Sequence, residues 1–184
     1  LAFSGLVSGY NIEGGGVCNC NTCDDCELAL NDAVDCTLLV KLTADITDYA
    51  GTCIDNPANF SNKVFDCQGN TIDGDNISTI RGFLLSANTH NNTIRNCIVN
   101  EFRWGIQLSA TSSNTTLINN SFCSNLELDI RDLDISNSGD NNTCDTTFQW
   151  NDAGTYGCTS FCGNYSYYNW TVRYQSDYYQ FPSV

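Results

Sequence analysis

The sequence predicts an all-β protein, a parallel β-helix in which each short coil buries its apolar side chains against the next. Three similar stretches lead to this prediction, because they recur at intervals of 22 or 23 residues: 82–86 (GFLLS), 105–109 (GIQLS) and 127–131 (ELDIR). A second motif, at 91–96 (NNTIRN), recurs 23 residues later at 114–119 (NTTLIN). Repeats of roughly 20 to 30 residues are typical of solenoids, whose units cannot bury their apolar faces alone.

The repeated stretches have the pattern of strands. Apolar residues alternate with residues that can face solvent, which is the period of a half-buried strand. We align Phe83, Ile106 and Leu128 as one column of the core. The segments between them are rich in Asn, Ser, Thr, Gly and Asp, which favour turns. A unit of about 23 residues suits three short strands with tight bends, stacked about 4.8 Å apart.

Asn96 and Asn119 are expected to form the bends at the ends of equivalent strands, and Asp66 is expected to hold the same position one coil earlier. Asn and Asp tolerate the left-handed backbone that a sharp bend needs. Their side chains either form a hydrogen-bonded ladder from coil to coil or are ordinary turn residues. Both interpretations give them a structural role.

Residues 1–16 form an N-terminal extension that does not fit the repeat. Its apolar side chains are Leu1, Phe3, Leu6, Val7, Tyr10 and Ile12. Such an extension either folds back over its own β-helix as a cap or adds a strand to the next subunit. We interpret these residues as assembly residues that link subunits head to tail.

Residues 17–36 form a Cys-rich cap with a short helix. Cys18, Cys20, Cys23 and Cys26 lie within nine residues and could hold zinc or an iron–sulfur cluster. We favour disulfides, because the rest of the chain indicates an oxidising compartment. Asp24 or Asp25 is expected to cap a helix over 26–34, and this segment would cover the open first coil.

Residues 37–157 form the β-helix itself. The segments 42–46 (LTADI), 65–74 (FDCQGNTIDG), 92–97 (NTIRNC) and 105–109 (GIQLS) together resemble the right-handed parallel β-helix proteins of the pectin-lyase-like superfamily. The similarity is greatest to Asn- and Thr-rich secreted members common on archaeal and bacterial surfaces. It covers roughly residues 36 to 150 and implies the fold. It leaves the function open, because this superfamily includes lyases, hydrolases, adhesins and structural proteins.

Residues 158–184 form an aromatic C-terminal extension. Trp170, Val172 and Tyr174 alternate with Thr171 and Arg173, which predicts a strand with one apolar face. This extension, too, either folds back over its own β-helix as a cap or adds a strand to the next subunit.

The composition favours an extracellular or cell-surface protein. The formal net charge of −14 argues against nucleic acid as a partner, and no run reaches the roughly 18 apolar residues of a membrane span. The chain has no Met and begins at Leu1, which we interpret as prior removal of an N-terminal signal.

Twelve cysteines, an even number, predict a framework of disulfides in a secreted protein. They are Cys18, Cys20, Cys23, Cys26, Cys36, Cys53, Cys67, Cys97, Cys123, Cys144, Cys158 and Cys162. Cys67 and Cys97 are expected to point inward from neighbouring coils, where stacked strands lie close enough for a bridge. Each is expected to be oxidised, with the partner of each left open.

Seven Asn-x-Ser/Thr sequons are candidate glycosylation sites. They are Asn59, Asn76, Asn91, Asn114, Asn141, Asn164 and Asn169. Asn91 and Asn114 hold the same place in their units, so glycans there would form a row. An eighth sequon asparagine, Asn119, is expected to point inward at the bend instead.

No catalytic, cofactor-binding or metal-binding residues are predicted. The single histidine, His90, lies in a predicted turn, and Asp73, Asp75 and Asp129 give no sign of the opposed pair that a glycosidase needs. Arg81, Arg95, Arg103 and Arg131 form no evident row. Residues 132–136 begin like a calcium loop, but the required Gly and Glu are missing further on.

We therefore expect a non-catalytic, glycosylated and disulfide-rich extracellular structural protein. Its main partner would be itself, in a filament or surface layer, and surface glycans are a second possible partner. The alternatives are a carbohydrate-binding or adhesin module, with Phe102 and Trp104 as a sugar-stacking platform, and a polysaccharide lyase or hydrolase.

Overall fold

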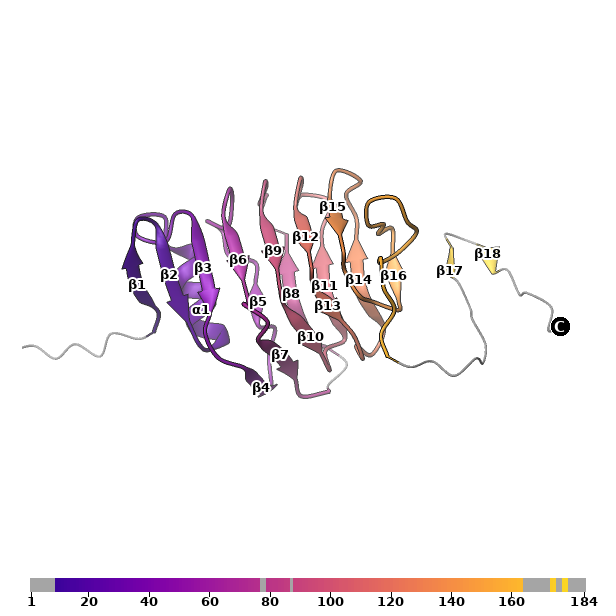
Figure 1. Cartoon of the computed structure of the whole chain (residues 1–184), viewed down its shortest axis with the longest axis horizontal. Coiled ribbons are helices and arrows are strands. Elements are labelled where there is room, and N and C mark those ends of the chain that lie inside the picture. The colour runs from indigo at the N-terminus through magenta and orange to yellow at the C-terminus, as the bar shows by residue number, and fades with distance from the viewer. Residues whose placement is uncertain (1–8, 77–78, 87, 164–172, 175–176, 179–184) are drawn as a thin grey trace, which may run out of the picture.

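The computed structural model describes residues 9–76, 79–86, 88–163, 173–174 and 177–178. The protein is a parallel β-helix of about five turns, with the coils stacked along one long axis (Figure 1). The predicted fold class is thus confirmed. Strands of successive coils pair in parallel, and among the strand pairs of the described residues only β1–β2 and β17–β18 are antiparallel.

Three sheets form the walls. Sheet A consists of β1 (Asn11–Gly14), β2 (Val17–Cys20), β3 (Leu39–Leu42), β6 (Val64–Asp66), β9 (Thr93–Arg95), β12 (Thr116–Ile118) and β15 (Ser138–Asp140). Sheet B consists of β4 (Ile46–Tyr49), β7 (Thr71–Gly74), β10 (Ile98–Asn100) and β13 (Ser121–Phe122). Sheet C consists of β5 (Ile54–Asp55), β8 (Arg81–Leu85), β11 (Trp104–Leu108), β14 (Leu128–Asp132) and β16 (Thr147–Phe148). A short hairpin, β17 (Arg173–Tyr174) and β18 (Asp177–Tyr178), follows.

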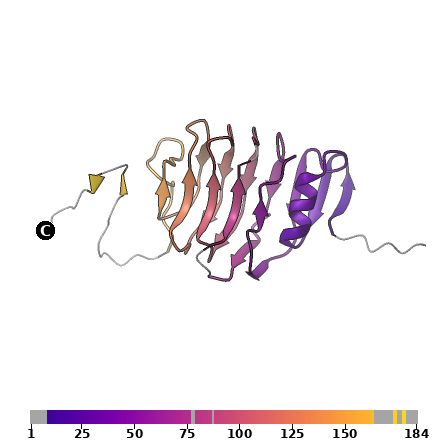
Figure 2. The same cartoon turned by 180° about the vertical axis from the view of Figure 1, so that it is seen from behind.

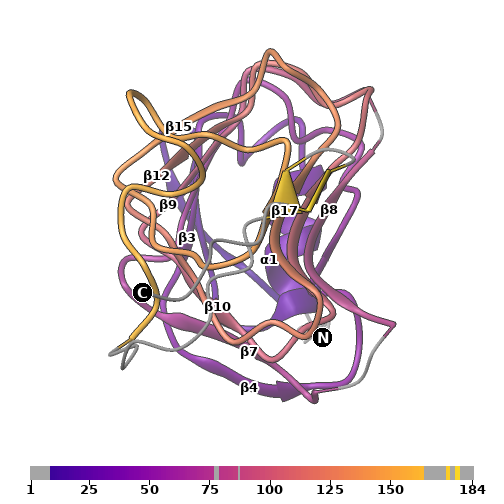
Figure 3. The same ribbon diagram turned by 90° about the vertical axis from the view of Figure 1, so that its right-hand side faces the viewer.

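The core consists of columns of apolar side chains, one residue from each coil. In sheet A, the buried residues Val40, Phe65, Ile94 and Leu117 stack in register. Sheets B and C supply similar columns, and viewed down the long axis the three walls enclose this core (Figure 3). Full burial of one such side chain contributes about 1.5–3 kcal/mol, so each added coil extends a continuous apolar interior.

The predicted column in sheet C was wrong at its last member. Phe83 and Ile106 are in register, but the residue that follows them is Ile130, and Leu128 lies beside Trp104. The reason is one additional residue in the turn between sheets B and C of that coil. Asn125 fills this longer turn, since its Nδ2 donates to the Val99 carbonyl (3.2 Å) and to Asp129 Oδ1 (2.9 Å).

The bends are made mainly by asparagine. Asn96, Asn119 and Asn141 have positive φ and form one column, and Asn62, Asn91 and Asn114 form a second at the opposite edge of sheet A. The prediction that Asn96 and Asn119 form bends is therefore confirmed. Asparagine suits these positions because it adopts the left-handed conformation at little cost.

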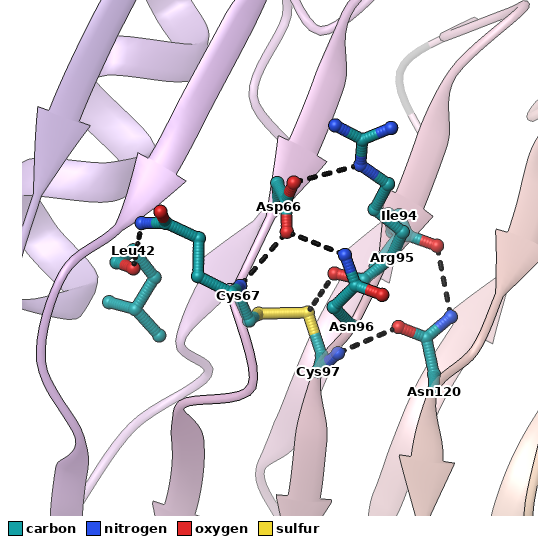
Figure 4. A network of polar contacts seen from close by, with 9 residues as sticks. Leu42, Asp66, Cys67, Ile94, Arg95, Asn96, Cys97 and Asn120 are labelled. Carbon is teal, nitrogen blue, oxygen red and sulfur yellow. Dashed lines mark hydrogen bonds and ion pairs between the residues drawn. A yellow bond between two sulfur atoms is a disulfide. The ribbon is translucent and has the colours of Figure 1, made fainter.

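The prediction for Asp66 was wrong, because Asp66 lies beside Arg95 and not beside Asn96. Its carboxylate accepts hydrogen bonds from Arg95 Nε (2.8 Å) and from Asn96 Nδ2 (2.9 Å), as Figure 4 shows. The coil of Asp66 has a longer turn, 67–70, where the next coil has only Asn96 and Cys97. Asp66 is therefore not itself a bend residue, but its carboxylate holds the side chain of the bend residue Asn96 in the next coil.

The ladder of side chains lies one residue further along than predicted. Buried Asn120 accepts from the Cys97 backbone N–H (3.0 Å) and donates to the Ile94 carbonyl (2.9 Å), as seen in Figure 4. Asn120 also donates to Asn142 Oδ1, and Asn142 donates to Asp152 Oδ1 (2.7 Å). At the exposed bend positions one such hydrogen bond forms, from Asn141 Nδ2 to Asn119 Oδ1 (2.7 Å). Inside the wall, these amides satisfy backbone groups that water cannot reach.

The Cys-rich segment supplies the first coil as well as a cap. Its strand β2 pairs in parallel with β3, and α1 (Cys23–Asn31) follows, lying beside the first strand of sheet C (Figure 2). The helix begins and ends three residues earlier than predicted. Its N-cap is Thr22, whose hydroxyl accepts from the Asp25 N–H (3.2 Å), and Val34 is exposed beyond its end. Lys63 Nζ satisfies the carbonyls of Leu30 (2.8 Å) and Asp32 (2.7 Å) at the other end.

All twelve cysteines form disulfides, as expected. The pairs are Cys18–Cys36, Cys20–Cys26, Cys23–Cys53, Cys67–Cys97, Cys123–Cys162 and Cys144–Cys158. The N-terminal cluster therefore keeps no thiolate for a metal. Among the residues that the structure describes, no helix is long and apolar enough to cross a membrane.

Replacing Asn120 by Ala should destabilise the protein strongly. The change removes the acceptor of a buried N–H and the donor of a buried carbonyl, each worth about 1–3 kcal/mol when left unsatisfied. Asn119→Gly, one position away on the exposed side, is the matched control and should change stability little, because glycine readily adopts the positive φ of this bend. Thermal unfolding of the two variants distinguishes them, and equal midpoints would contradict the ladder.

Removing the Cys67–Cys97 bridge with a double Ala substitution should also destabilise the fold. The bridge closes a loop with a sequence separation of 30, for which the loss of chain entropy predicts roughly 3–4 kcal/mol. Chemical denaturation of the oxidised variant measures this value. A loss below about 1 kcal/mol would mean that the stacked strands alone fix these coils.

Candidate functional site

The N-terminal end of the solenoid exposes an open sheet edge. All four residues of β1 are exposed, and β1 pairs on one side only, with Ile12 opposite Cys18. Within the described residues no strand pairs with its outer side. The unpaired backbone groups of an edge strand are a template for another chain. Ile12 adds apolar surface there, because the residue is 47 % exposed.

The predicted assembly residues fall into two groups. Leu1, Phe3, Leu6 and Val7 lie outside the described residues. Tyr10 packs partly against the core, and its hydroxyl donates to Asp32 Oδ2 (2.6 Å). This hydrogen bond, together with burial, raises the pKa of Tyr10 to about 12. Tyr10 and β1 thus fold over their own coil, as in the capping interpretation, and leave the outer edge of β1 free.

Three arginines meet on the outer face of sheet C, although the sequence showed no row. The guanidinium carbons of Arg81, Arg103 and Arg131 lie 4.7, 4.4 and 4.8 Å from the centre of the Trp104 ring. The one-residue insertion before β14 hid this arrangement, because it shifts Arg131 into register with Gln107. We call these four residues the Arg–Trp cluster.

Polar partners hold the Arg–Trp cluster in place. Arg81 Nε donates to Gln107 Oε1 (2.7 Å), and Trp104 Nε1 donates to Glu127 Oε2 (3.0 Å). Arg103 Nε also lies 3.0 Å from Glu127 Oε2, as an ion pair whose N–H is not aimed at the oxygen. Burial and the charges of Arg103 and Arg131 lower the pKa of Arg81. The cluster is therefore a local excess of positive charge on an acidic protein.

The cluster changes the interpretation of the aromatic pair Phe102 and Trp104. Phe102 is fully buried and packs under the turn, so it offers no surface to a sugar. Three guanidinium groups lie against the Trp104 ring, where cation–π attraction stabilises them. An open sugar-stacking platform is therefore wrong for this pair.

An acidic group lies at the N-terminal end of the same face. It consists of Asp24 and Glu27 on α1 and Asp55 on β5, which we call the acidic cluster. Glu27 Oε2 accepts from the Asp55 N–H (3.3 Å), and Asp24 Oδ1 accepts from the Tyr49 hydroxyl (2.9 Å). Burial raises the pKa of Glu27, and repulsion from Asp55 and Asp24 adds to this. The outer face of sheet C thus carries negative charge beside its first strand, β5, and positive charge around the strands β8, β11 and β14.

The acids considered for catalysis have separate structural surroundings. Asp73 lies in β7 of sheet B, and Asp75 follows that strand. Asp129 lies in β14 of sheet C, where its oxygens accept from Asn125 Nδ2 (2.9 Å), the Thr146 N–H (3.0 Å) and other donors. A carboxylate satisfied in this way stabilises the turn around it. His90 is exposed in its turn.

The incomplete calcium loop is held by its own hydrogen bonds. Asp132 Oδ1 accepts from the Asp134 N–H (3.0 Å) and Asn137 Nδ2 (2.8 Å), and Asp134 Oδ1 accepts from Ser136. No group of three His, Cys, Asp or Glu residues that could hold a metal occurs in the described part of the chain. Asp132 is buried in the column that begins with Leu85 and Leu108, and burial raises its pKa.

The candidate glycosylation sites within the described residues are exposed. Asn59, Asn76, Asn91, Asn114 and Asn141 all face solvent, and Asn164 and Asn169 lie outside the described residues. Asn119 is exposed as well, contrary to expectation, because Asn120 is the residue that turns inward. Asn119 and Asn141 line a shallow groove of about 360 Å³ together with Ser121 and Thr143, the hydroxyl residues of their sequons.

No known protein family, curated protein or solved structure matches this chain. The function of the exposed edge of β1 and of the two charged clusters must therefore be inferred from their geometry alone.

Replacing Asp132 by Asn should stabilise the protein at neutral pH. A carboxyl whose pKa is raised by folding favours the folded state while protonated and loses that contribution as pH rises through the folded pKa. The amide keeps Oδ1 for its two donors and removes the buried charge. The gain in thermal midpoint should appear at pH 7 and vanish near pH 4. Asp134→Asn is the control and should act in the opposite direction at pH 7, because hydrogen bonds from Ser136 lower the pKa of Asp134.

Proposed function

We propose that this protein is a non-catalytic extracellular structural protein whose subunits assemble head to tail into a filament or surface layer. The observation that carries the proposal is the exposed outer edge of β1 at the end of sheet A. Stacking a second subunit on this edge would continue the solenoid, because the spacing between coils and the spacing between subunits would both be set by strand pairing. The apolar residues Leu1, Phe3, Leu6 and Val7 would seat on the C-terminal end of the neighbour.

An extracellular location is supported by the disulfides and the sequons. Six disulfides with no free cysteine fit an oxidising compartment, and exposed sequons fit a glycan coat. We also propose that the chain is related to the secreted pectin-lyase-like β-helix proteins of archaeal and bacterial surfaces, and its parallel β-helix fold is compatible with this. The absence of catalysis is part of the proposal and rests on the structural surroundings of Asp129 and Asp132.

Deleting residues 1–8 should give a subunit that stays monomeric. The deletion removes the apolar segment and keeps the Tyr10–Asp32 hydrogen bond and β1, so the fold itself should be retained. Electron microscopy and sedimentation of the intact and shortened chains measure the outcome. If the shortened chain forms the same filaments, the segment has no role in assembly.

Ile12→Lys should block assembly through the edge of β1. A charged side chain on an edge strand opposes the approach of another strand. Leu28→Lys is the matched control, because Leu28 has the same exposed fraction of 47 % but lies on α1. Assembly should be lost for the first variant and kept for the second. Equal behaviour of the two would remove β1 from the proposal.

A further inference from the structure

We propose that the Arg–Trp cluster binds a compact, doubly charged tetrahedral oxyanion of the sulfate or phosphate type, as the free ion or as a phosphate monoester. The anion would lie on the outer face of sheet C and accept hydrogen bonds from the guanidinium groups of Arg81, Arg103 and Arg131. This site does not use the solenoid ends, so it is independent of the proposed head-to-tail assembly.

The β-helix holds the cluster on a rigid frame. Arg81, Trp104 and Arg131 belong to β8, β11 and β14, which are neighbouring strands of sheet C. The guanidinium carbons of all three arginines lie within 4.8 Å of the centre of the Trp104 ring. Arg103 directly precedes β11, and its backbone N–H donates to the Ile80 carbonyl (2.9 Å). Because strand pairing fixes these positions, a ligand would bind with little reorganisation of the protein.

The cluster contains more hydrogen-bond donors than its own chain uses. A guanidinium group has five N–H donors. Arg131 forms no hydrogen bond or ion pair with any residue that the structure describes, and its contacts are with the rings of Trp104 and Phe148. Arg81 donates from Nε to Gln107 Oε1 (2.7 Å), which leaves its terminal N–H groups for a ligand. Three groups placed around one ring suit the four oxygens of a tetrahedral anion better than the two coplanar oxygens of a carboxylate.

The charge of the cluster favours a dianion. Glu127 lies 3.0 Å from Arg103 and balances one of the three positive charges. Burial and the charges of Arg103 and Arg131 lower the pKa of Arg81, and attraction to Asp55 opposes this only in part. No ion pair joins Asp55 to Arg81 among the described residues. A dianion would relieve the remaining repulsion through charge-assisted hydrogen bonds, which are roughly twice as strong as neutral ones.

The surroundings of the cluster favour a compact ligand over a polyanion. The other basic residues of the β-helix lie away from sheet C. Lys41 and Arg95 are paired with carboxylates in sheet A, and Lys63 Nζ binds carbonyls at the end of α1. A polyanion gains its affinity from many cationic contacts along its length. Here it would meet one cationic site, with the acidic cluster beside it, on a protein of net charge −14.

Calorimetric titration of the full-length protein tests the choice of anion. The probes are sodium sulfate, phosphate, methyl phosphate and acetate, at constant ionic strength and about pH 8, where the phosphates are mainly doubly charged. Sulfate or phosphate should bind at least about tenfold more tightly than acetate, because acetate has half the charge and fewer acceptors. Binding of phosphate without methyl phosphate would restrict the site to the free ion, and binding of both would admit the ester.

Two results of the titration would overturn the inference. One is acetate binding as tightly as the dianions, or no binding of any dianion. The other is dextran sulfate binding more than about tenfold more tightly, per sulfate group, than free sulfate, because the surface would then recognise a polyanion.

Three substitutions locate the bound anion. Arg131→Gln removes one charge and its donors, so sulfate binding should weaken at least about tenfold. Arg95→Gln is the matched control, since it removes the same charge in sheet A, and should leave binding unchanged. Glu127→Gln keeps an oxygen for Trp104 Nε1 but removes the negative charge, so binding should tighten. Loss of the fold cannot explain a gain in one variant and a loss in another.

Nuclear magnetic resonance reports on the site directly. The indole N–H resonance of Trp104, assigned with Trp104→Phe, should shift as sulfate is added to the wild-type protein. A resonance that stays fixed while sulfate binds would place the anion elsewhere and overturn the inference. Unchanged binding in folded Arg131→Gln, or an equal loss in Arg95→Gln, would do the same.

Discussion

The coil-to-coil register of the parallel strands is the constraint on which the rest of this structure depends. Stacking at strand spacing requires each coil to follow nearly the path of the one before it, so similar residues come to lie above each other. The apolar columns, the asparagine bends and the Asn120–Asn142–Asp152 ladder all result from this repetition. Gly82 and Gly105 show how tight it is, because a side chain at Gly82 would lie 2.5 Å from the Gly105 carbonyl oxygen.

Much of the fold could be predicted because the register leaves a periodic trace in the sequence. The repeats of Phe83 with Ile106 and of Ile94 with Leu117 lie 23 residues apart, and each pair is in register in the structure. The preference of asparagine for the left-handed region likewise marked Asn96 and Asn119. The errors arose where a coil gained or lost residues, as before β14 and after Asp66. A single additional residue shifts the register of the side chains that follow it. No local sequence pattern shows whether the additional residue belongs to the turn or to the strand beside it.

The candidate site was hidden for the same reason. Arg81, Arg103 and Arg131 are separated by unequal intervals, and only the true register brings them to one tryptophan. The acidic cluster depends in addition on where α1 begins, and the N-cap was Thr22 rather than the neighbouring aspartates. Charged residues on outward faces carry no periodic signal of their own, since solvent accepts them at any position. Their grouping becomes visible only after the coils have been stacked.

The disulfides have a mechanical consequence. A solenoid loaded along its long axis should yield from an end, one coil after another, because each coil is held mainly by its neighbours. Here Cys23–Cys53 fastens α1 to the segment leading into β5, and Cys123–Cys162 and Cys144–Cys158 fasten the last coils. Peeling from either end is therefore stopped by covalent bonds before the apolar interior opens. Under a tensile load, the part of the chain between Cys18 and Cys162 can lengthen only in the spans that no disulfide closes.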